Sequence, residues 1–177
     1  MKKTILIIAL SLVGMMMSLT ANAQNDRKVT IGVLGGTNMY LDVNQTNADW
    51  HFVPGGSIFA DCSVVTFGKG HFTVGGQAGF QYWNPGDNKL GGKSLDFSVA
   101  PRLTVGWNLA KWFELHVGTT TGLGISNWRG AKDVNFAFAY SGFVGVRFFF
   151  GDLFGLTIEG GYASHTPDVC AGLVFRF

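Results

Sequence analysis

The sequence is poor in charge and in cysteine, and each shortage excludes a class of protein. Only 14% of its 177 residues are charged, whereas 47% are hydrophobic. This balance excludes a disordered chain and a strongly charged nucleic-acid-binding chain, so no nucleic-acid partner is expected. The two cysteines, Cys62 and Cys170, are too few for a disulfide-rich secreted scaffold. Four histidines lie in separate segments without metal-ligand spacing, and no phosphate-binding glycine motif occurs, so neither a metal nor a cofactor is expected.

Beyond residue 23 the sequence also lacks a hydrophobic run of the roughly 18 to 20 residues that a membrane helix needs. The one long apolar run, residues 5–17, follows Lys2 and Lys3 and precedes the small residues Ala21 and Ala23. This order is typical of a secretory signal peptide with an A-x-A-like cleavage site. We therefore expect a signal peptide over residues 1–23 and a single domain over residues 24–177. Without Lys2 and Lys3, the formal charge of +2 falls to zero.

The sequence is rich in glycine and phenylalanine, and its clearest pattern has a period of two residues. From residue 95 to residue 108, apolar residues such as Leu95, Phe97 and Val99 alternate with small or polar ones such as Arg102 and Thr104. Because side chains alternate between the two faces of a strand, this pattern predicts a strand with one apolar face. The same alternation occupies residues 71–83, 113–126, 136–150 and 169–177, and less regularly residues 28–37, 51–64 and 156–164. Eight strands are therefore expected.

The connections between these strands alternate in length. Residues 65–70, 109–112 and 151–155 are short links, whereas residues 38–50, 84–94 and 127–135 are longer and polar. The glycine-rich face suits the interior of a narrow tube, and lipid permits strands to span it only as a closed sheet. We therefore predict an all-β fold, an eight-stranded antiparallel up-and-down transmembrane β-barrel with both termini at one end. Outer-membrane lipid would surround it, and five tryptophans near strand ends would anchor it at the interface: Trp50, Trp83, Trp107, Trp112 and Trp128.

Two features depart from a regular barrel. Pro101 lies in the middle of the clearest strand, where it cannot donate a backbone hydrogen bond, so we expect a local bulge. Residues 165–168 form a link of only four residues at the end that carries the longer links. The two cysteines belong to opposite faces, Cys62 to the lipid-facing set and Cys170 to the inward set, which argues against a disulfide between them.

The charges on the inward face are candidate functional residues. If the hairpin through residues 151–155 is centred on Leu153, Arg147 lies directly across from Glu159, and Arg176 can join the pair. One interpretation is a paired network that fills the lumen, and the other is a narrow pore for ions or small solutes. The strand number favours the first, because an eight-stranded barrel is just wide enough for its own side chains. The full set of predicted inward charges is Asp96, Arg102, Glu114, His116, Arg147, Glu159 and Arg176.

A third possibility is a lipid-modifying enzyme. Ser164, His165 and Asp168 lie together near a strand end and are the residue types of a hydrolytic triad. The same residue types are common in turns, and adjacency along the chain does not create hydrogen-bond geometry. We therefore expect no catalytic residues.

The last nine residues, Val169-Cys170-Ala171-Gly172-Leu173-Val174-Phe175-Arg176-Phe177, resemble the terminal strand of a known family. That family comprises the small eight-stranded outer-membrane barrels of Gram-negative bacteria, such as the OmpA and OmpX transmembrane domains. The resemblance implies an outer-membrane location, and Phe175 and Phe177 would form the signal to the barrel-assembly machinery. It also implies a barrel without a periplasmic peptidoglycan-binding domain, because nothing follows this strand. The expected role is non-enzymatic, in surface interaction or envelope stabilisation, with the external ligand left open.

Overall fold

The computed structural model describes residues 29–44, 47–83, 94–128 and 135–177. These residues form eight β-strands. The strands are β1 (Val29–Asn44), β2 (Asn47–Phe67), β3 (Gly70–Trp83), β4 (Ser94–Ala110), β5 (Phe113–Trp128), β6 (Asn135–Phe150), β7 (Phe154–Ala163) and β8 (Val169–Arg176). The expected signal peptide lies outside the described residues. Within them, no helix is long and apolar enough to cross a membrane.

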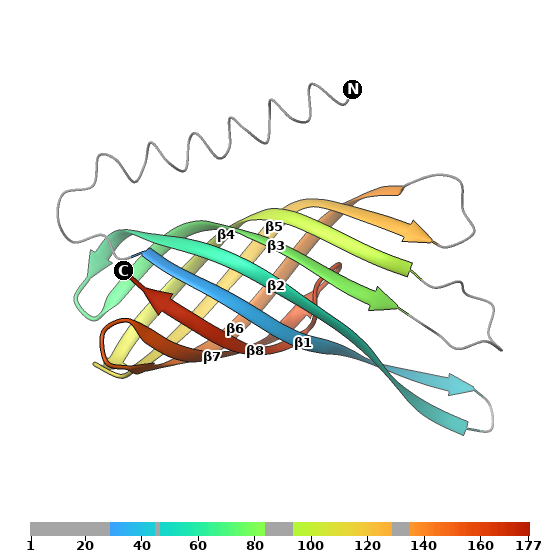
Figure 1. Ribbon diagram of the computed structural model, residues 1–177, viewed down its shortest axis with the longest axis horizontal. Coiled ribbons are helices and arrows are strands. Elements are labelled where there is room, and N and C mark those ends of the chain that lie inside the picture. The colour runs from blue at the N-terminus through green and yellow to red at the C-terminus, as the bar shows by residue number, and fades with distance from the viewer. Residues whose placement is uncertain (1–28, 45–46, 84–93, 129–134) are drawn as a thin grey trace.

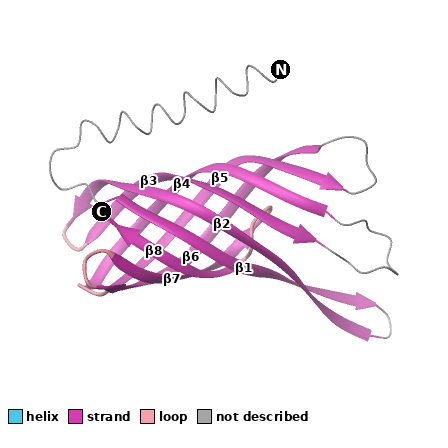
Figure 2. Ribbon diagram, viewed as in Figure 1, coloured by secondary structure: helices cyan, strands magenta, loops and turns pink. Residues whose placement is uncertain are grey.

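The strands close into one barrel (Figures 1 and 2). Each strand pairs antiparallel with the next, and β1 pairs with β8, so the sheet has no break around its circumference. Reciprocal backbone hydrogen bonds of 2.9 and 2.8 Å join Val29 to Phe177, which places the start of β1 beside the end of the chain. The prediction of an eight-stranded up-and-down antiparallel barrel is confirmed.

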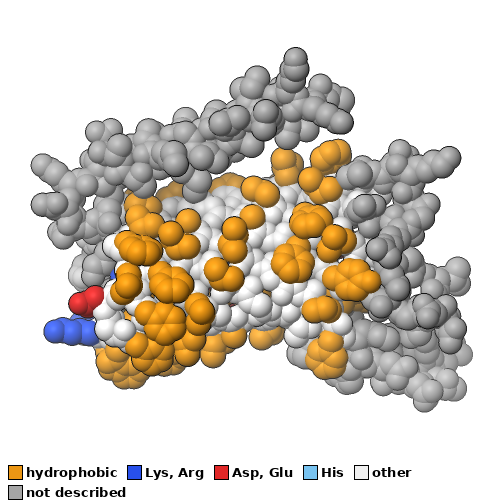
Figure 3. Space-filling model, viewed as in Figure 1, with side chains coloured by type: hydrophobic (Ala, Val, Ile, Leu, Met, Phe, Trp, Pro, Cys, Tyr) orange, Lys and Arg blue, Asp and Glu red, His pale blue; other side chains and the backbone are white. Residues whose placement is uncertain are grey.

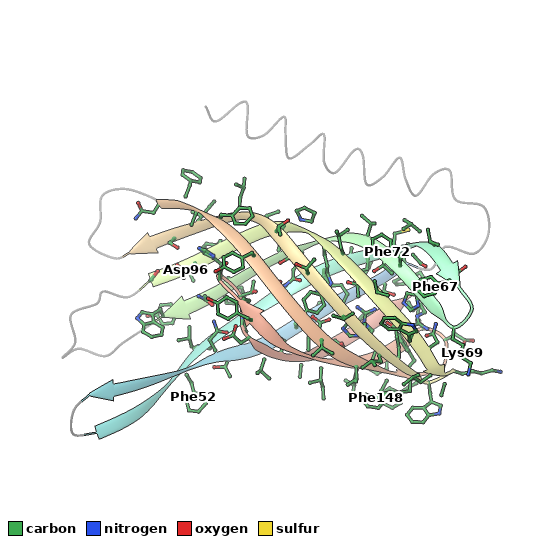
Figure 4. All side chains as sticks on the ribbon, turned by 180° about the vertical axis from the view of Figure 1, so that it is seen from behind. Phe52, Phe67, Lys69, Phe72, Asp96 and Phe148 are labelled. Carbon is green, nitrogen blue, oxygen red and sulfur yellow. The ribbon has the colours of Figure 1, made fainter. Side chains whose placement is uncertain are left out.

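The period-two pattern places apolar side chains outside and polar ones inside. On β4, Val99 is 68% exposed, whereas Arg102 is fully buried. Figure 3 shows hydrophobic side chains spread over the visible barrel wall, with charged side chains of the described residues gathered at one end. Figure 4 shows Phe52 projecting away from β2 on the outer surface. A closed sheet satisfies its own backbone, so this apolar exterior is suited to lipid.

The two ends of the barrel differ. One end carries the turns at residues 68–69, 111–112 and 151–153, which we call the short-turn end. Gly68 and Gly151 have φ values of 58° and 78°, a conformation that favours glycine and allows these reversals. Lys69 lies at this end, as Figure 4 shows. Residues 84–93 and 129–134 lie outside the described residues.

The prediction of a polar loop over residues 38–50 is wrong. β1 continues to Asn44 and β2 begins at Asn47, with an unbroken register from Gly36↔Gly55 to Asn44↔Asn47. Residues 39–44 and 47–52 pair with each other, beyond the last β8 and β3 partners, and extend past the barrel as a two-stranded ribbon (Figure 1). Polar, turn-forming residues do not prevent a strand when the neighbouring strand supplies the backbone hydrogen bonds.

The bulge predicted at Pro101 is also wrong. Pairing between β4 and β5 skips Ala100 and Pro101, but it resumes at Arg102↔Thr120 in the same register as Val99↔Leu123. Pro101 is exposed on the lipid-facing side, and its missing N–H interrupts the ladder without inserting a residue. Register shifts occur instead at Ser63/Val65 and Asn108/Ala110, near the short-turn end.

Candidate functional site in the barrel lumen

Inward side chains from six strands meet in the barrel lumen. They come from residues far apart in the sequence, which the pairing of successive strands around the closed barrel brings together. Arg102, Glu114 and His116 have no exposed surface, and Arg147 has 1%. We call this cluster the charged layer: Asp61 of β2, Arg102 of β4, Glu114 and His116 of β5, Arg147 of β6, Glu159 of β7 and Arg176 of β8.

Arg102 lies at the centre of the charged layer. Its Nη2 and Nη1 donate to Glu159 at 2.6 and 3.2 Å, and its Nε donates to Asp61 at 3.2 Å. Nη1 also donates to Gln77 Oε1 at 2.7 Å. Glu159 further contacts His116 Nε2 at 3.1 Å. Arg102 therefore joins β2, β3 and β7 across the lumen.

A second arginine connects this centre to the short-turn end. Arg147 donates to Glu114 at 2.9 Å and to Asp61 at 3.3 Å. Arg176 in turn contacts Glu114, and His71 Nε2 lies 3.6 Å from the same carboxylate. The ion pairs thus run continuously from Glu159 through Asp61 to Glu114, and each guanidinium faces at least one carboxylate.

Aromatic rings cover the flat faces of the guanidinium groups. The Arg102 guanidinium lies 4.3 Å from the Phe59 ring centroid and 4.0 Å from that of Phe143. Arg176 lies 3.5 Å from the Phe149 centroid. Such contacts are favourable when the cation is removed from water. Phe59 and Phe149 also belong to a buried cluster with Leu34, so the lumen contains an apolar core that the alternation alone did not indicate.

The predicted opposition of Arg147 and Glu159 is wrong. Glu159 lies across from Gly145, and Arg147 lies across from Thr157. The hairpin is centred on Asp152 rather than Leu153, and this shift moves each partner by two residues. A two-residue shift preserves the face of every side chain, so both residues still point inward but bind different partners.

The remaining predicted charge, Asp96, lies apart from the charged layer. Its carboxylate accepts hydrogen bonds from Ser94 at 2.8 Å and Gln81 at 3.2 Å, toward the end opposite the short turns. Conversely, the sequence interpretation missed Asp61, although the signal was present: Asp61 lies between Ala60 and Cys62 of the lipid-facing set and must point inward.

The Ser164, His165 and Asp168 side chains do not form a triad. Ser164 Oγ lies 2.8 Å from His165 Nδ1 and accepts a hydrogen bond from the Tyr140 amide at 3.0 Å. The Asp168 carboxylate accepts from the Ala163 amide at 2.8 Å, and within the described part of the chain no hydrogen bond joins it to His165. The serine is thus not part of a relay that ends on a carboxylate.

The cysteines and the metal-binding residue types give no further site among the described residues. Cys62 and Cys170 are both free thiols, as expected from their opposite faces. The described ranges contain no group of three or more His, Cys, Asp or Glu side chains able to hold a metal ion.

Two cavities adjoin the charged layer. At the short-turn end, a vestibule of about 800 Å³ is lined by polar side chains that include Thr30, Ser63, His71 and Arg176. At the opposite end, a void of about 20 Å³ separates the layer from the link between β7 and β8. The void has room for about one water molecule. The lumen is therefore wide at the short-turn end and narrow between the charged layer and the β7–β8 link.

No protein-family model and no curated protein sequence matches this chain. Among solved structures, it is similar to Neisserial surface protein A, with a TM-score of 0.53, 10% identity, and coverage of 86% of this chain and 96% of that one. It is also similar to Ail, the attachment invasion locus protein of Yersinia pestis, with a TM-score of 0.50, 13% identity, and coverage of 85% and 97%. The complex of Ail with the heparin analogue sucrose octasulfate gives a TM-score of 0.51 at 14% identity, with the same coverage.

At these identities the likeness shows a shared fold. The chain has the fold of the small eight-stranded outer-membrane β-barrels.

Proposed function

We propose that this barrel is a non-enzymatic outer-membrane protein whose lumen is closed by the charged layer, and that it acts in surface interaction or envelope stabilisation. The observation that carries the closed lumen is the bridging of opposite walls by Arg102, which binds Asp61 and Glu159 without any exposed surface. Three carboxylates face three guanidinium groups in the layer, so its formal charge is balanced with neutral histidine. Paired charges in a narrow barrel fill it rather than line a water column.

The arrangement of the outer wall and of the two barrel ends also supports a placement in the membrane. The apolar outer wall would contact outer-membrane lipid, and the short-turn end would face the periplasm, as is usual in such barrels. Phe175 and Phe177 end the chain at this side, where Phe177 is 65% exposed. We infer that this strand is the segment presented to the barrel-assembly machinery.

Single-channel recording tests the closed lumen. The folded protein, verified by heat-dependent gel mobility, is inserted into planar bilayers, and current is measured at both polarities. We expect no discrete steps. Steps from verified folded protein would overturn the closed lumen and establish a pore.

A small pore for ions or small solutes is the second candidate, and the vestibule is the observation that favours it. About 800 Å³ of polar-lined space reaches Arg176 from the short-turn end, and the charged layer and the β7–β8 link lie between this space and the opposite mouth. In a pore, conductance would occur in the native protein, and replacing Arg102 with Met would change its ion selectivity. If the barrel is closed, the native protein gives no current steps.

The non-enzymatic proposal is supported by the placement of Ser164, whose oxygen is engaged by a backbone amide, and of Asp168, which is bound to the Ala163 amide. Incubation of the folded protein with lipid A, followed by mass spectrometry, should show no mass change. A mass change that disappears in His165→Ala would instead establish an enzyme and implicate this residue.

The cellular role is tested by envelope integrity and by adhesion. Loss of the gene should increase detergent sensitivity if the barrel stabilises the envelope, and should reduce attachment to surfaces if it acts in adhesion. Reintroduction of the native gene is the control. Normal detergent resistance together with normal attachment would contradict both roles.

A further inference from the structure

The link between β7 and β8 folds into the barrel instead of away from it. This link comprises residues 164–168, one more than expected, because β7 ends at Ala163. Thr166 is 8% exposed, and Pro167 is also buried. Backbone hydrogen bonds hold both ends of the link: Ser164 N donates to Tyr140 O at 3.0 Å, and Asp168 O accepts from Gly161 N at 2.8 Å. The link therefore has a defined position inside the mouth opposite the short turns.

Asn38 of β1 fastens this link to the wall. Its side chain is fully buried, and its Nδ2 donates to Thr166 O at 3.3 Å and to Gln81 Oε1 at 2.8 Å. Its Oδ1 accepts a hydrogen bond from Asp168 N. One amide thus binds the middle and the end of the link and ties both to β3.

Glycines in the barrel wall make room for the link. A Cβ at Gly79 would lie 2.5 Å from Thr166 Cγ2, and a Cβ at Gly124 would lie 2.7 Å from the His165 ring. By contrast, a Cβ at Gly142, on the outer face of β6, would meet open space. A methyl group at Gly79 would therefore require the Thr166 side chain to shift, and one at Gly124 would require the His165 ring to shift, whereas one at Gly142 would displace nothing.

The forces that hold the link differ from those in the charged layer. Asn38 contributes hydrogen bonds between neutral groups, whereas the layer is joined by charge-assisted bonds between buried groups. Neutral hydrogen bonds contribute less net stability than charged ones. Local openings of a protein begin where the contacts are weakest. The link should therefore leave its seat without disruption of the layer beneath it.

We propose that residues 164–168 form a stopper in the outer half of the lumen, latched by Asn38, which opens independently of the charged layer and controls access to it from outside. This inference rests on the proposed closed lumen and adds a second closure in series. When the stopper is out, the outer mouth would reach as far as Glu159 and Arg102. When it is seated, a void of about 20 Å³ lies between the link and these two side chains.

The chain contains its own reporter for this movement. Cys170 points inward, is 7% exposed, and its Sγ lies 3.5 Å from the carbonyl oxygen of Pro167 in the link. The thiol is therefore covered by the seated stopper. The other cysteine, Cys62, is replaced by Ala so that Cys170 is the single reactive thiol.

The experiment measures the rate at which a charged, membrane-impermeant methanethiosulfonate reagent modifies Cys170 in the purified, folded protein in lipid nanodiscs. We expect slow modification in the Cys62→Ala protein relative to the urea-unfolded protein. Asn38→Ala removes the latch and Gly124→Val displaces His165, and each should raise the rate at least about tenfold, since a few weakened contacts shift an opening equilibrium by that factor. The matched control, Gly142→Val, should leave the rate unchanged.

A disulfide staple tests the converse without weakening the fold. Thr166→Cys removes the Cγ2 methyl group that lies 2.5 Å from the Cβ position of Gly79, so the side chain of Gly79→Cys no longer meets it. The two Cβ atoms lie within about 4 Å, a separation that a disulfide spans. In the Cys62→Ala background, the oxidised Gly79→Cys, Thr166→Cys protein should show slower modification of Cys170. The same protein, reduced and then freed of reductant, should show the faster rate, with the modified cysteine identified by peptide mass spectrometry. Native-like rates in Asn38→Ala, Gly124→Val and the stapled protein, all verified as folded, would overturn the stopper, as would a native rate equal to the unfolded one.

Current recordings on Asn38→Ala separate this inference from the proposed closed lumen. Fast modification of Cys170 without current steps supports both the stopper and the charged layer as barriers. Fast modification with discrete current steps supports the stopper and overturns the charged layer as a closure. Unchanged modification with silent bilayers overturns the stopper alone.

Discussion

Replacement of Arg102 by Met is the most demanding test of the charged layer. Arg102 has no exposed surface and contacts Glu159 at 2.6 Å and Asp61 at 3.2 Å. Without it, Glu159 retains only the contact with His116 at 3.1 Å, and Asp61 retains Arg147 at 3.3 Å. Removal of one partner from a buried ion pair leaves an uncompensated charge and typically costs about 3–5 kcal/mol. We expect a loss of this size in the free energy of unfolding.

The loss is measured by urea unfolding of the folded protein in lipid vesicles, followed by tryptophan fluorescence and gel mobility and extrapolated linearly to water. The double variant Arg102→Met with Glu159→Gln should lose less stability than Arg102→Met alone, because the unpaired carboxylate is removed as well. Lys111→Met, at an exposed turn, is the control and should change stability by less than about 0.5 kcal/mol. A loss below about 1 kcal/mol for Arg102→Met, or strictly additive losses in the double variant, would refute the reasoning.

Three further substitutions test the wall, the lipid face and the end of the chain. Gly145→Ala should lower stability by about 1–3 kcal/mol in the same urea assay, because its Cβ would lie 2.6 Å from a backbone oxygen and from a histidine ring, whereas Gly142→Ala meets open space and should be neutral. Equal effects would contradict the packing argument. Leu103→Arg, on the outer face of β4, should cost about 2–4 kcal/mol in vesicles, and Asp152→Arg at a turn should cost almost nothing; a tolerated Leu103→Arg would argue against a lipid-facing wall. Phe177→Ser should reduce the amount of protein in the outer membrane of living cells, measured by fractionation and immunoblotting, while refolding of the purified chain is unchanged. An undiminished amount would exclude an assembly role for this residue.

The proposed closure of the lumen does not depend on one interaction. Ion pairs connect opposite walls, and the rings of Phe59 and Phe143 lie against the central guanidinium. A purely electrostatic network would carry a high desolvation cost, which packing against aromatic rings offsets in part. The charged layer is therefore also part of the hydrophobic interior.

The sequence by itself determined the number of strands and the face to which most side chains point. A period of two assigns every residue of a strand to one of two faces, so Arg102, Glu114 and Arg147 were expected inside without any knowledge of their neighbours. The same reasoning applies to Asp61: its place between two lipid-facing residues in the alternation predicts an inward side chain, although it was not included among the predicted inward charges. The closed sheet follows from the environment, because lipid offers no partner for an unpaired edge.

Only the tertiary structure decided which inward residues meet. The register of a hairpin depends on the exact geometry of its turn, and a shift by two residues leaves the alternation intact while Arg147 exchanges Glu159 for Glu114. Local sequence likewise did not predict two further features: the inward fold of residues 164–168 and the continuation of β1 and β2 past the barrel. The link is held by hydrogen bonds with a residue distant in sequence, Asn38, which binds Thr166 and Asp168. The β1 and β2 extension is held by the pairing of these two strands with each other, which their polar, turn-forming composition does not indicate.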